Sequence, residues 1–593
     1  MTFEIALTLG IILVAVILLA TEKLRPDLVA LLVMLALVIT GLIDVEGAFQ
    51  GFASPAVVTV WAVYIVSAAL FKTGVTDVLS RWMMRLAGSS EPRLIAVVML
   101  MCGTISAFVN NIGATAMLIP AVVGVSRKTK VPLSRLLIPL AFASLLGGNM
   151  TEIGTPPNIL ATAILAERGF TTFRLFDFTP TGVLVFATGV LYMISIGRLL
   201  LPSRPDIDAE RSSQLRRYVT EIRVRRGSPL AGLTLAQARL NRELGVTVLA
   251  LIRDEQPSAT VGGDTRIEVG DLLIVSGDVP SLMEARDALG VAIEPDFEFD
   301  LDALTGDSAV LVEAVLPSGS RLVGSTPREM RFRDRYGFTV LAVWRRGEIL
   351  ARRVGDFRLR AGDVLLLKGP RENLADLQRD QQILVLEGVE QDEQRRHKAP
   401  WALGIIVLVL GLIAVGGLHV SLAMVIGAVL TVLTGCLTMD EAYEAIEWRS
   451  IFLIAGMLPL GTVMDTTGTA RFLADQVVRV TGQGGPIAVM AGIFALAGLI
   501  TEVMSNAAAT VLMAPIAIDA ALSLGVQPHG FVLTTVIGAS TSFLTPFGHQ
   551  ANVLVFGVGN YRFSDFARVG ALLSLALLVV TILAVPLFWP LRP

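Results

Sequence analysis

The stretch that decides the fold reads SAFVNN at residues 106–111, and its pattern returns as TEVMSN at residues 501–506, 395 positions later. Both stretches lie between strongly apolar segments, and in both a proline follows nine residues after the last asparagine. An irregular segment follows each copy, GTPPN at residues 154–158 and GHQAN at residues 548–552. Hydrophobic segments interrupted by Gly or Pro at matching positions of two halves are typical of a transporter binding site in a membrane.

The composition is that of an integral membrane protein. The chain has 593 residues, more than one domain usually holds. It is 53% hydrophobic and 17% charged, with a mean hydropathy of +0.69, whereas soluble domains are about 25% charged. The net charge of −3 gives no sign of a nucleic-acid partner. The two cysteines, Cys102 and Cys436, form no disulfide framework and no metal-ligand pattern.

Apolar runs of about membrane length occupy two parts of the chain, residues 4–200 and 400–590. A helix needs about 20 apolar residues to cross the bilayer core, but several of these runs are shorter and end at Asn, Gly or Pro. Polar backbone at membrane depth is tolerated only where protein buries it or where it lines a cavity. We therefore expect two re-entrant hairpins, at 92–126 and 485–523. We also expect two broken helices, at 134–167 and 530–560.

This pattern predicts a polytopic α-helical membrane protein built from two inverted repeats. Each half holds five spans, and because five is odd, the halves insert with opposite orientation. We place the first transmembrane repeat at residues 1–202 and the second at 399–593. The positive-inside rule then predicts both termini outside and a cytosolic insert, and we expect a multi-pass protein of the inner membrane. Arg471 and Arg479 break the rule; they lie in a predicted interfacial helix at 469–482, which resembles the stretch 76–88.

The insert is itself a tandem repeat with a period of 92 residues. A glycine occurs at 232 and again at 324, and the run TVLA begins at 247 and again at 339. A Gly-Asp turn begins at 270 and again at 362. Short β-branched runs bounded by such turns are typical of strands. We expect two tandem small α/β domains, residues 203–300 and 301–398.

The hairpin tips carry the chemistry. Asn and Ser side chains, together with unwound backbone carbonyls, are oxygen ligands for a hard cation such as Na⁺. Helix N-termini beside them favour an anion, and secondary transporters use broken helices in this way. The alternative is that these side chains only satisfy backbone groups at the helix breaks.

Two acidic residues lie near the tips. Carboxylates inside a membrane are costly and are functional candidates by default. Glu152 and Glu502 are therefore candidates for a proton or cation relay. The alternative is a paired or cavity-facing carboxylate that supports the hairpin.

The paired motifs resemble those of divalent anion–sodium symporters. Residues 110–112 and 505–507 are similar to the Ser-Asn-Thr hairpin tips of that family, and GTPPN at 154–158 is similar to its first Thr-Pro-Pro-Asn loop. The segment 548–552 aligns with the second loop, so the resemblance covers both membrane halves. It implies an elevator-type movement of a transport domain against a scaffold, and a homodimer in the lipid membrane.

The resemblance also implies two sodium sites and one anion site, with Na⁺ as the coupling ion and no other cofactor. The first sodium site uses Ser106, Asn110, Asn111 and the Gly154 carbonyl. The second uses Thr501, the Met504 carbonyl, Asn506 and the Gly548 carbonyl. The anion lies between the tips, and its candidate ligands are Asn110, Asn111, Thr155, Ser505, Asn506, His549 and Gln550.

Departures from the family pattern change the expected substrate. Asn110 stands where the family has Ser, and Ile112 and Ala507 stand where it has Thr, so two hydroxyls for a dicarboxylate are missing. His549 and Gln550 replace Thr and Pro, and a histidine can donate to an oxyanion and become cationic at mildly acidic pH. We expect Na⁺-coupled symport of a small inorganic divalent oxyanion, with sulfate favoured.

Other activities stay open at this point. One alternative is a dicarboxylate symporter or a proton-coupled anion transporter, and a more distant one is a Na⁺/H⁺ antiporter that uses Glu152 and Glu502. A gated channel is disfavoured because the sequence has no TVGYG-like filter. We expect no enzyme, because no Ser/His/Asp order, metal cluster or nucleotide loop stands out.

The 92-residue repeat resembles the C-terminal (RCK-C) domain of regulators of potassium conductance. That resemblance implies either a small-molecule or nucleotide ligand on these domains or a role in assembly alone. The insert has no Walker motif and no GxGxxG turn, which disfavours ATP hydrolysis.

Overall fold

The computed structural model describes most of the chain. The described residues are 2–21, 23–75, 85, 90–129, 131–204, 219–225, 227–238, 240, 247–253, 256–258, 264–276, 292–293, 309–317, 320–345, 348–350, 354–380, 382–385, 393–415 and 417–591. The predicted interfacial helix at 76–88 therefore lies outside the described residues, apart from Arg85.

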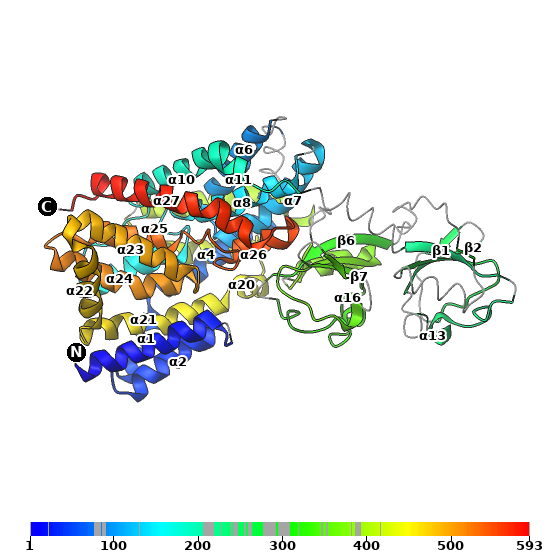
Figure 1. Ribbon diagram of the computed structural model, residues 1–593, viewed down its shortest axis with the longest axis horizontal. Coiled ribbons are helices and arrows are strands. Elements are labelled where there is room, and N and C mark those ends of the chain that lie inside the picture. The colour runs from blue at the N-terminus through cyan, green and yellow to red at the C-terminus, as the bar shows by residue number, and fades with distance from the viewer. Residues whose placement is uncertain are drawn as a thin grey trace.

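Helices on both sides of the insert form one membrane part (Figure 1). Before the insert the helices are α1 (Phe3–Thr21), α2 (Pro26–Ile39), α3 (Val45–Ala53), α4 (Pro55–Lys72), α6 (Glu91–Ser106), α7 (Asn111–Thr129), α8 (Leu137–Gly148), α9 (Pro156–Glu167), α10 (Thr179–Tyr192) and α11 (Arg198–Leu200). After it they are α18 (Ala399–Ala414), α19 (Val420–Leu433), α20 (Met439–Ala445), α21 (Trp448–Thr466), α22 (Thr469–Thr481), α23 (Gly485–Thr501), α24 (Asn506–Ser523), α25 (Pro528–Ala539), α26 (Gln550–Val558) and α27 (Phe563–Phe588).

Proline and glycine set many of these helix ends. Proline lies in the first turn of α2 and α4, where its missing N–H costs nothing. Gly41 follows α2 and Gly435 follows α19, with φ of 74° and 67°, a left-handed conformation that closes a helix and that glycine adopts without strain. The two ends lie at matching positions of the halves, so the duplication extends beyond the tip motifs.

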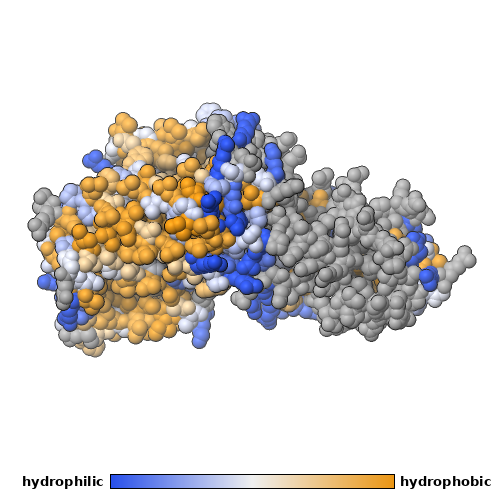
Figure 2. Space-filling model, turned by 45° about the horizontal axis from the view of Figure 1, so that its top comes forward, coloured by the Kyte–Doolittle hydropathy of each residue, from blue (hydrophilic) through white to orange (hydrophobic). Residues whose placement is uncertain are grey.

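Several of the helices are suited to a membrane. Among the described residues, five are long and apolar enough to span a bilayer, or seven if each of two bent pairs is one span. Large apolar side chains such as Leu13, Leu191 and Leu583 are exposed on their outer faces. Figure 2 shows hydrophobic residues over the helical part and hydrophilic residues gathered at its boundary toward the insert. This distribution fits a multi-pass membrane protein.

The helices pack as two groups. Helices α1–α4 pack with α18–α21, mainly through α2 on α21 and α4 on α19. Helices α6–α11 pack with α23–α27, mainly through α10 on α27 and α9 on α24. The groups meet where α21 contacts α24 and α4 contacts α9. Each group therefore draws on both halves of the chain, and the chain breaks that hold the candidate site all lie in the second group.

The insert contains two five-stranded sheets with the same topology. The first holds β1 (Val219–Arg223), β2 (Thr247–Arg253), β3 (Gln256–Ser258), β4 (Leu272–Ser276) and β5 (Ala292–Ile293), in the order β3-β2-β4-β1-β5. The second holds β6 (Ala309–Val315), β7 (Thr339–Arg345), β8 (Glu348–Leu350), β9 (Val364–Pro370) and β10 (Leu384–Val385), in the order β10-β6-β9-β7-β8. Read from the other edge, the second order matches the first strand by strand. Short helices α13 (Leu235–Ala238), α16 (Phe332–Tyr336) and α17 (Leu374–Arg379) accompany them.

Local details of the two sheets repeat as well. The register of β2 on β4 shifts between Val248 and Ala250, and that of β7 on β9 shifts between Val340 and Ala342. Arg253 pairs with Asp271 at 2.8 Å in the first sheet, and Arg345 pairs with Asp363 at 2.6 Å in the second. The 92-residue period of the sequence thus describes two copies of one fold.

Candidate functional site

Each hairpin tip is closed by a hydroxyl and an asparagine. Ser106 Oγ lies 2.8 Å from Asn111 Oδ1 and 2.7 Å from the Ser144 carbonyl oxygen. In the second half, Thr501 Oγ1 lies 2.7 Å from Asn506 Oδ1 and 2.6 Å from the Ala539 carbonyl oxygen. All four of these polar side chains are buried. The tip motif therefore ties each hairpin to the first part of the broken helix beside it.

The residue before each asparagine caps a helix. Asn110 Oδ1 accepts a hydrogen bond from the Gly113 N–H at 2.6 Å, and Ser505 Oγ accepts one from the Ala508 N–H at 3.3 Å. These bonds satisfy exposed N–H groups in the first turn of α7 and α24. The oxygens of Asn110 and Ser505 thus serve the helix starts, while Asn111 and Asn506 lie deeper in the tips.

Two asparagines outside the predicted ligand set, at the ends of the GTPPN and GHQAN motifs, hold the loops of the broken helices. Asn158 Nδ2 donates to the Gly148 carbonyl at 3.0 Å and to the Thr151 carbonyl at 2.6 Å. Asn552 Nδ2 donates to the Ser542 and Thr545 carbonyls at 2.7 and 3.3 Å. Both side chains are fully buried, and among the described residues neither Oδ1 has a hydrogen-bond partner. The signal in the sequence was their matching place, fourth after Gly154 and Gly548.

Glycines bring each loop against its hairpin tip. A Cβ on Gly154 would lie 2.6 Å from the Gly148 carbonyl oxygen and 3.0 Å from that of Ser106. A Cβ on Gly548 would lie 2.8 Å from a Glu502 carboxylate oxygen. These approaches require glycine, and they place the Gly154 backbone beside the first tip and the Gly548 backbone beside the second.

The two acidic residues have different surroundings. The Glu502 carboxylate accepts hydrogen bonds from the backbone N–H groups of Leu544 and Thr545, at 2.8 and 3.0 Å. Its contacts tie the second tip to the loop after α25, which is the supporting role that the sequence left open. Glu152 is 5% exposed, and among the described residues its Oε2 has no hydrogen-bond partner. Glu152 is therefore the acid of the two that a relay could use.

The remaining candidates differ in position. Thr155 precedes α9 and is buried, and Met504 is buried at the second tip. His549 caps α26, with Nδ1 accepting from the Ala551 N–H at 3.1 Å, and it is partly exposed. Gln550 is exposed, and its Nε2 lies 3.4 Å from Glu447 Oε1 at the start of α21. Gln550 thus contacts the other helix group.

The two half-sites belong to one packed core. Helix α7 contacts α26, and α24 contacts α9, so the second arm of each hairpin packs on the broken helix of the other half. The rings of Phe142 and Phe543 lie 4.6 Å apart between α8 and the loop after α25. Among the described residues, no three His, Cys, Asp or Glu side chains form a metal-binding group. Ligands for a cation here would be amide, hydroxyl and carbonyl oxygens.

A buried pair of helix breaks lined with Asn, Ser and Thr, inside a body of apolar helices, defines the class of a membrane transporter rather than an enzyme. The chain belongs to the citrate transporter family (CitMHS), whose family model matches residues 16–538.

Similar proteins carry transporter names. The chain is 36% identical to "Uncharacterized transporter sll0640" of Synechocystis sp., over 100% of this chain and 98% of that one. It is 31% identical to "Uncharacterized transporter YfbS" of Escherichia coli, over 100% of both chains. It is 29% identical to "Sodium/sulfate cotransporter 1" of Chlamydomonas reinhardtii, over 63% of this chain and 44% of that one. The expected resemblance to sodium–anion symporters is thereby confirmed.

Proposed function

We propose that this protein is a secondary active transporter that couples the uptake of a divalent oxyanion, with sulfate favoured, to Na⁺. The observation that carries the proposal is the duplicated tip, in which Ser106 with Asn111 and Thr501 with Asn506 make the same contacts. One buried amide in each half supplies a ligand for a cation. The name of the sodium/sulfate cotransporter relative supports the same pair of solutes.

Counting hydrogens supports cation binding by the amides. A hydroxyl has one hydrogen to donate, and a carbonyl can only accept. Thr501 lies within hydrogen-bond distance of both the Ala539 carbonyl and the Asn506 amide; if its hydrogen goes to the carbonyl, the amide NH₂ is the group that donates to Thr501. Amide orientation is assigned from such networks. Ser542 Oγ lies 2.8 Å from the same amide position, and in this orientation it accepts the second NH₂ hydrogen. The amide oxygen then takes the buried position on the other side, where the amide has no partner among the described residues.

The same count applies in the first half. Ser106 lies within hydrogen-bond distance of the Ser144 carbonyl and the Asn111 amide. If its single hydrogen serves the carbonyl, the Asn111 NH₂ donates to Ser106, and the Asn111 amide oxygen turns to the other side, where it could bind a cation. The first Na⁺ site would then use Ser106, Asn110, Asn111 and Gly154, and the second would use Thr501, Met504, Asn506 and Gly548.

The anion would lie between the tips. Helices α7, α9, α24 and α26 all begin at the tips or the broken-helix loops, and helix N-termini carry partial positive charge with free N–H groups. Thr155 and His549 precede two of these helices and can donate to an oxyanion. Ile112 and Ala507 offer no hydroxyl, which favours a compact tetrahedral anion over a dicarboxylate.

The two helix groups support an elevator-type movement in an inverted-repeat fold. All four chain breaks lie in the group of α6–α11 and α23–α27, which would carry the site past the group of α1–α4 and α18–α21 as a scaffold. Both termini lie at the end of the helical part away from the insert (Figure 1). We propose an inner-membrane protein with outside termini, a cytosolic insert of two RCK-C-like domains, surrounding lipid and a second copy of the chain as its partner.

Radiolabelled sulfate uptake into proteoliposomes tests the function. Uptake should need an inward Na⁺ gradient, fail with choline, and resist excess succinate and citrate. Asn111→Ala and Asn506→Ala should abolish it, whereas Thr188→Ala, an exposed hydroxyl on α10, should not. Absence of sulfate uptake in intact vesicles would overturn the substrate.

A second candidate substrate is citrate or another carboxylate, which the family description favours. Inhibition of sulfate uptake by citrate at similar concentration would support it. For the coupling ion, the alternative to Na⁺ is a proton carried through Glu152. Proton coupling predicts uptake that is driven by a pH gradient and does not depend on Na⁺. Na⁺/H⁺ exchange without any anion would support the antiporter instead.

Labelling of an introduced cysteine tests the placement of the insert. Val269 is 49% exposed in the turn before β4, and both native cysteines are buried. Val269→Cys in intact cells should react with a membrane-impermeant maleimide only after permeabilisation. Labelling without permeabilisation would contradict a cytosolic insert.

A further inference from the structure

The second sheet of the insert packs into the core of the membrane part. Five of its residues are buried in the same continuous apolar cluster as the transport helices: Val315, Ala342, Trp344, Val364 and Leu366. Figure 1 shows β6 and β7 next to α26, with the first sheet at the far end of the molecule. Strand β6 and helix α26 are in contact. One face of a soluble-type sheet therefore has a membrane helix as its packing partner.

Two glycines meet where the sheet and α26 approach each other. A Cβ on Gly557 of α26 would lie 1.9 Å from the carbonyl oxygen of Gly362, in the turn before β9. A Cβ on Gly362 would lie 3.8 Å from the Val553 carbonyl oxygen and 3.9 Å from the Phe556 ring. No residue with a side chain fits at position 557 while the sheet is docked.

The first sheet provides an internal comparison. Its Gly270 corresponds to Gly362 in the 92-residue repeat, has a similar φ of 99°, and would have nothing within 4 Å of an added Cβ. Its buried residues, among them Leu251 and Leu273, form a cluster of their own. Two copies of one fold thus differ in that the second is docked on α26, and the fold itself does not require the docking.

Helix α26 leads directly to the candidate site. Gly557 lies five residues after Asn552, which is about 8 Å along a helix. Asn552 holds the loop carbonyls of Ser542 and Thr545, and His549 caps the same helix. A helix of nine residues moves as a rigid unit, so a displacement at Gly557 would reach the loop.

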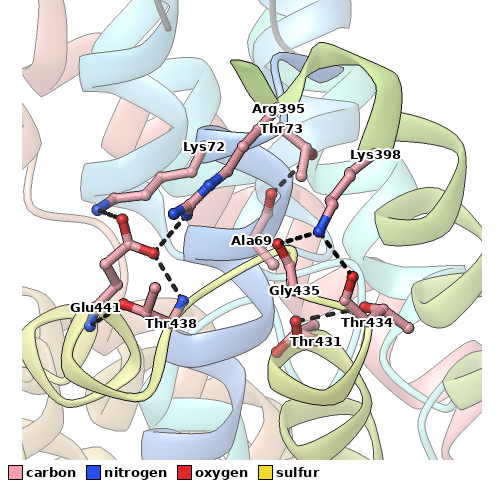
Figure 3. A network of polar contacts seen from close by, with 10 residues as sticks. All are labelled: Ala69, Lys72, Thr73, Arg395, Lys398, Thr431, Thr434, Gly435, Thr438 and Glu441. Carbon is pink, nitrogen blue, oxygen red and sulfur yellow. Dashed lines mark hydrogen bonds and ion pairs between the residues drawn. The ribbon is translucent and has the colours of Figure 1, made fainter.

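The chain after the insert is tied to the other helix group. Arg395 pairs with Glu441 of α20 at 2.5 Å, and Glu441 also pairs with Lys72 of α4 at 3.0 Å (Figure 3). Lys398 donates to the carbonyls of Thr434 and Gly435 at the end of α19. On the side before the insert, Arg204 pairs with Asp565 of α27. The insert therefore joins the two groups that would move against each other.

We propose that the second sheet is a regulatory clamp on α26, through which the state of the insert sets the shape and cation affinity of the second half-site. The proposal deepens the transport function above and rests on it for its effect on uptake. A ligand that favours the docked sheet would hold the loop at residues 540–549 in one conformation, and undocking would release it.

Gly557→Ala tests the clamp, because the added methyl group pushes the sheet away while alanine favours the helix itself. Gly404→Ala is the matched control, a glycine of α18 with nothing within 4 Å. Trp344→Ala removes a buried side chain of the second sheet from the shared apolar cluster. Hydrogen exchange of residues 540–558 and of β9, in the full-length protein in detergent, reports docking and the site without any substrate. Uptake as a function of Na⁺ concentration reports function.

We expect Gly557→Ala and Trp344→Ala to speed exchange in both segments and to shift the half-saturating Na⁺ concentration by about fivefold or more, with Gly404→Ala like the wild type. Unchanged exchange in residues 540–549 would overturn the proposal, even if β9 exchanges faster. Faster exchange with an unaltered Na⁺ dependence would also overturn it. If the wild type itself shows no uptake, the transport proposal fails, while the exchange data still decide whether the sheet controls the loop.

Discussion

Thr501 closes the second hairpin tip onto Asn506, with 2.7 Å between Thr501 Oγ1 and the amide of Asn506, while the same hydroxyl lies 2.6 Å from the Ala539 carbonyl. One small side chain thus joins both arms of the hairpin to the broken helix behind it. In the first half Ser106 makes the same contacts. Losing the hydroxyl should therefore affect amide orientation before it affects the fold.

We predict that Thr501→Ala raises the half-saturating Na⁺ concentration for uptake about tenfold, equivalent to ~1.4 kcal/mol, with a smaller change in maximal rate. Thr501→Ser keeps the hydroxyl and should behave nearly as the wild type. Uptake measured over a Na⁺ series in proteoliposomes checks this. Equal Na⁺ dependence in the Ala and Ser variants would show that the hydroxyl does not orient a cation ligand.

We predict that Asn158→Asp and Asn552→Asp each weaken both stability and Na⁺ dependence. An aspartate has the same shape but cannot donate to the two loop carbonyls, and leaving buried acceptors unpaired costs about 1–3 kcal/mol. Thermal unfolding in detergent should show lower midpoints for both variants. Raising the Na⁺ concentration should restore part of the wild-type midpoint if these loops bind the ion, and a purely structural role predicts no such recovery.

Glu152 and Glu502 should respond differently to neutralisation. Glu502→Gln weakens the acceptor of two backbone N–H groups and should lower the unfolding free energy by about 1–3 kcal/mol. Glu152→Gln removes a carboxylate whose Oε2 has no hydrogen-bond partner in the described part of the chain, so the midpoint should stay the same or rise. Thermal unfolding of both variants side by side checks that Glu502→Gln lowers the midpoint more than Glu152→Gln does. A larger loss for Glu152→Gln would mean that its carboxylate has a stabilising partner.

The first sheet should lose stability at acidic pH. Burial raises the pKa of the Asp271 carboxyl, but hydrogen bonds from Arg253 and the Glu268 N–H more than offset burial, so its pKa is lowered overall. A lowered pKa in the folded state stabilises the sheet above the unfolded pKa of about 3.9 and loses that effect as the pH falls through the folded value. Hydrogen exchange of β4, corrected for the intrinsic pH effect, should rise in that window.

Asp271→Asn provides the control for the pH effect. This variant lacks the charge at every pH, so its β4 exchange should be faster near neutral pH and should change little between pH 5 and pH 3 beyond the intrinsic effect. An acid-induced loss of protection as large as in the wild type would assign the pH dependence to another group.

Much of this architecture follows from the sequence for local reasons. Two apolar runs, 92–109 and 113–126, meet at Asn110 and Asn111 and predict a helix break there, because polar backbone inside a membrane must be enclosed by protein. The 92-residue period predicts two like folds, because strands and Gly-Asp turns are set by neighbouring residues. In the structure, the chain forms helices on both sides of this break and two sheets of matching strand order in the insert.

The sequence by itself determined where the chain breaks, which residues cluster at the breaks, and that one pattern repeats in the two membrane halves and another in the two parts of the insert. These features depend on hydrophobic patterning and backbone preference within a few residues. Only the tertiary structure decided which acid is paired, which asparagines hold the loops and which sheet docks on α26. Glu502 finds its partners 42 residues away at Leu544, and Gly362 meets Gly557 across the molecule. Such contacts depend on how whole elements pack, and nothing in the local sequence distinguishes Glu152 from Glu502 or Gly270 from Gly362.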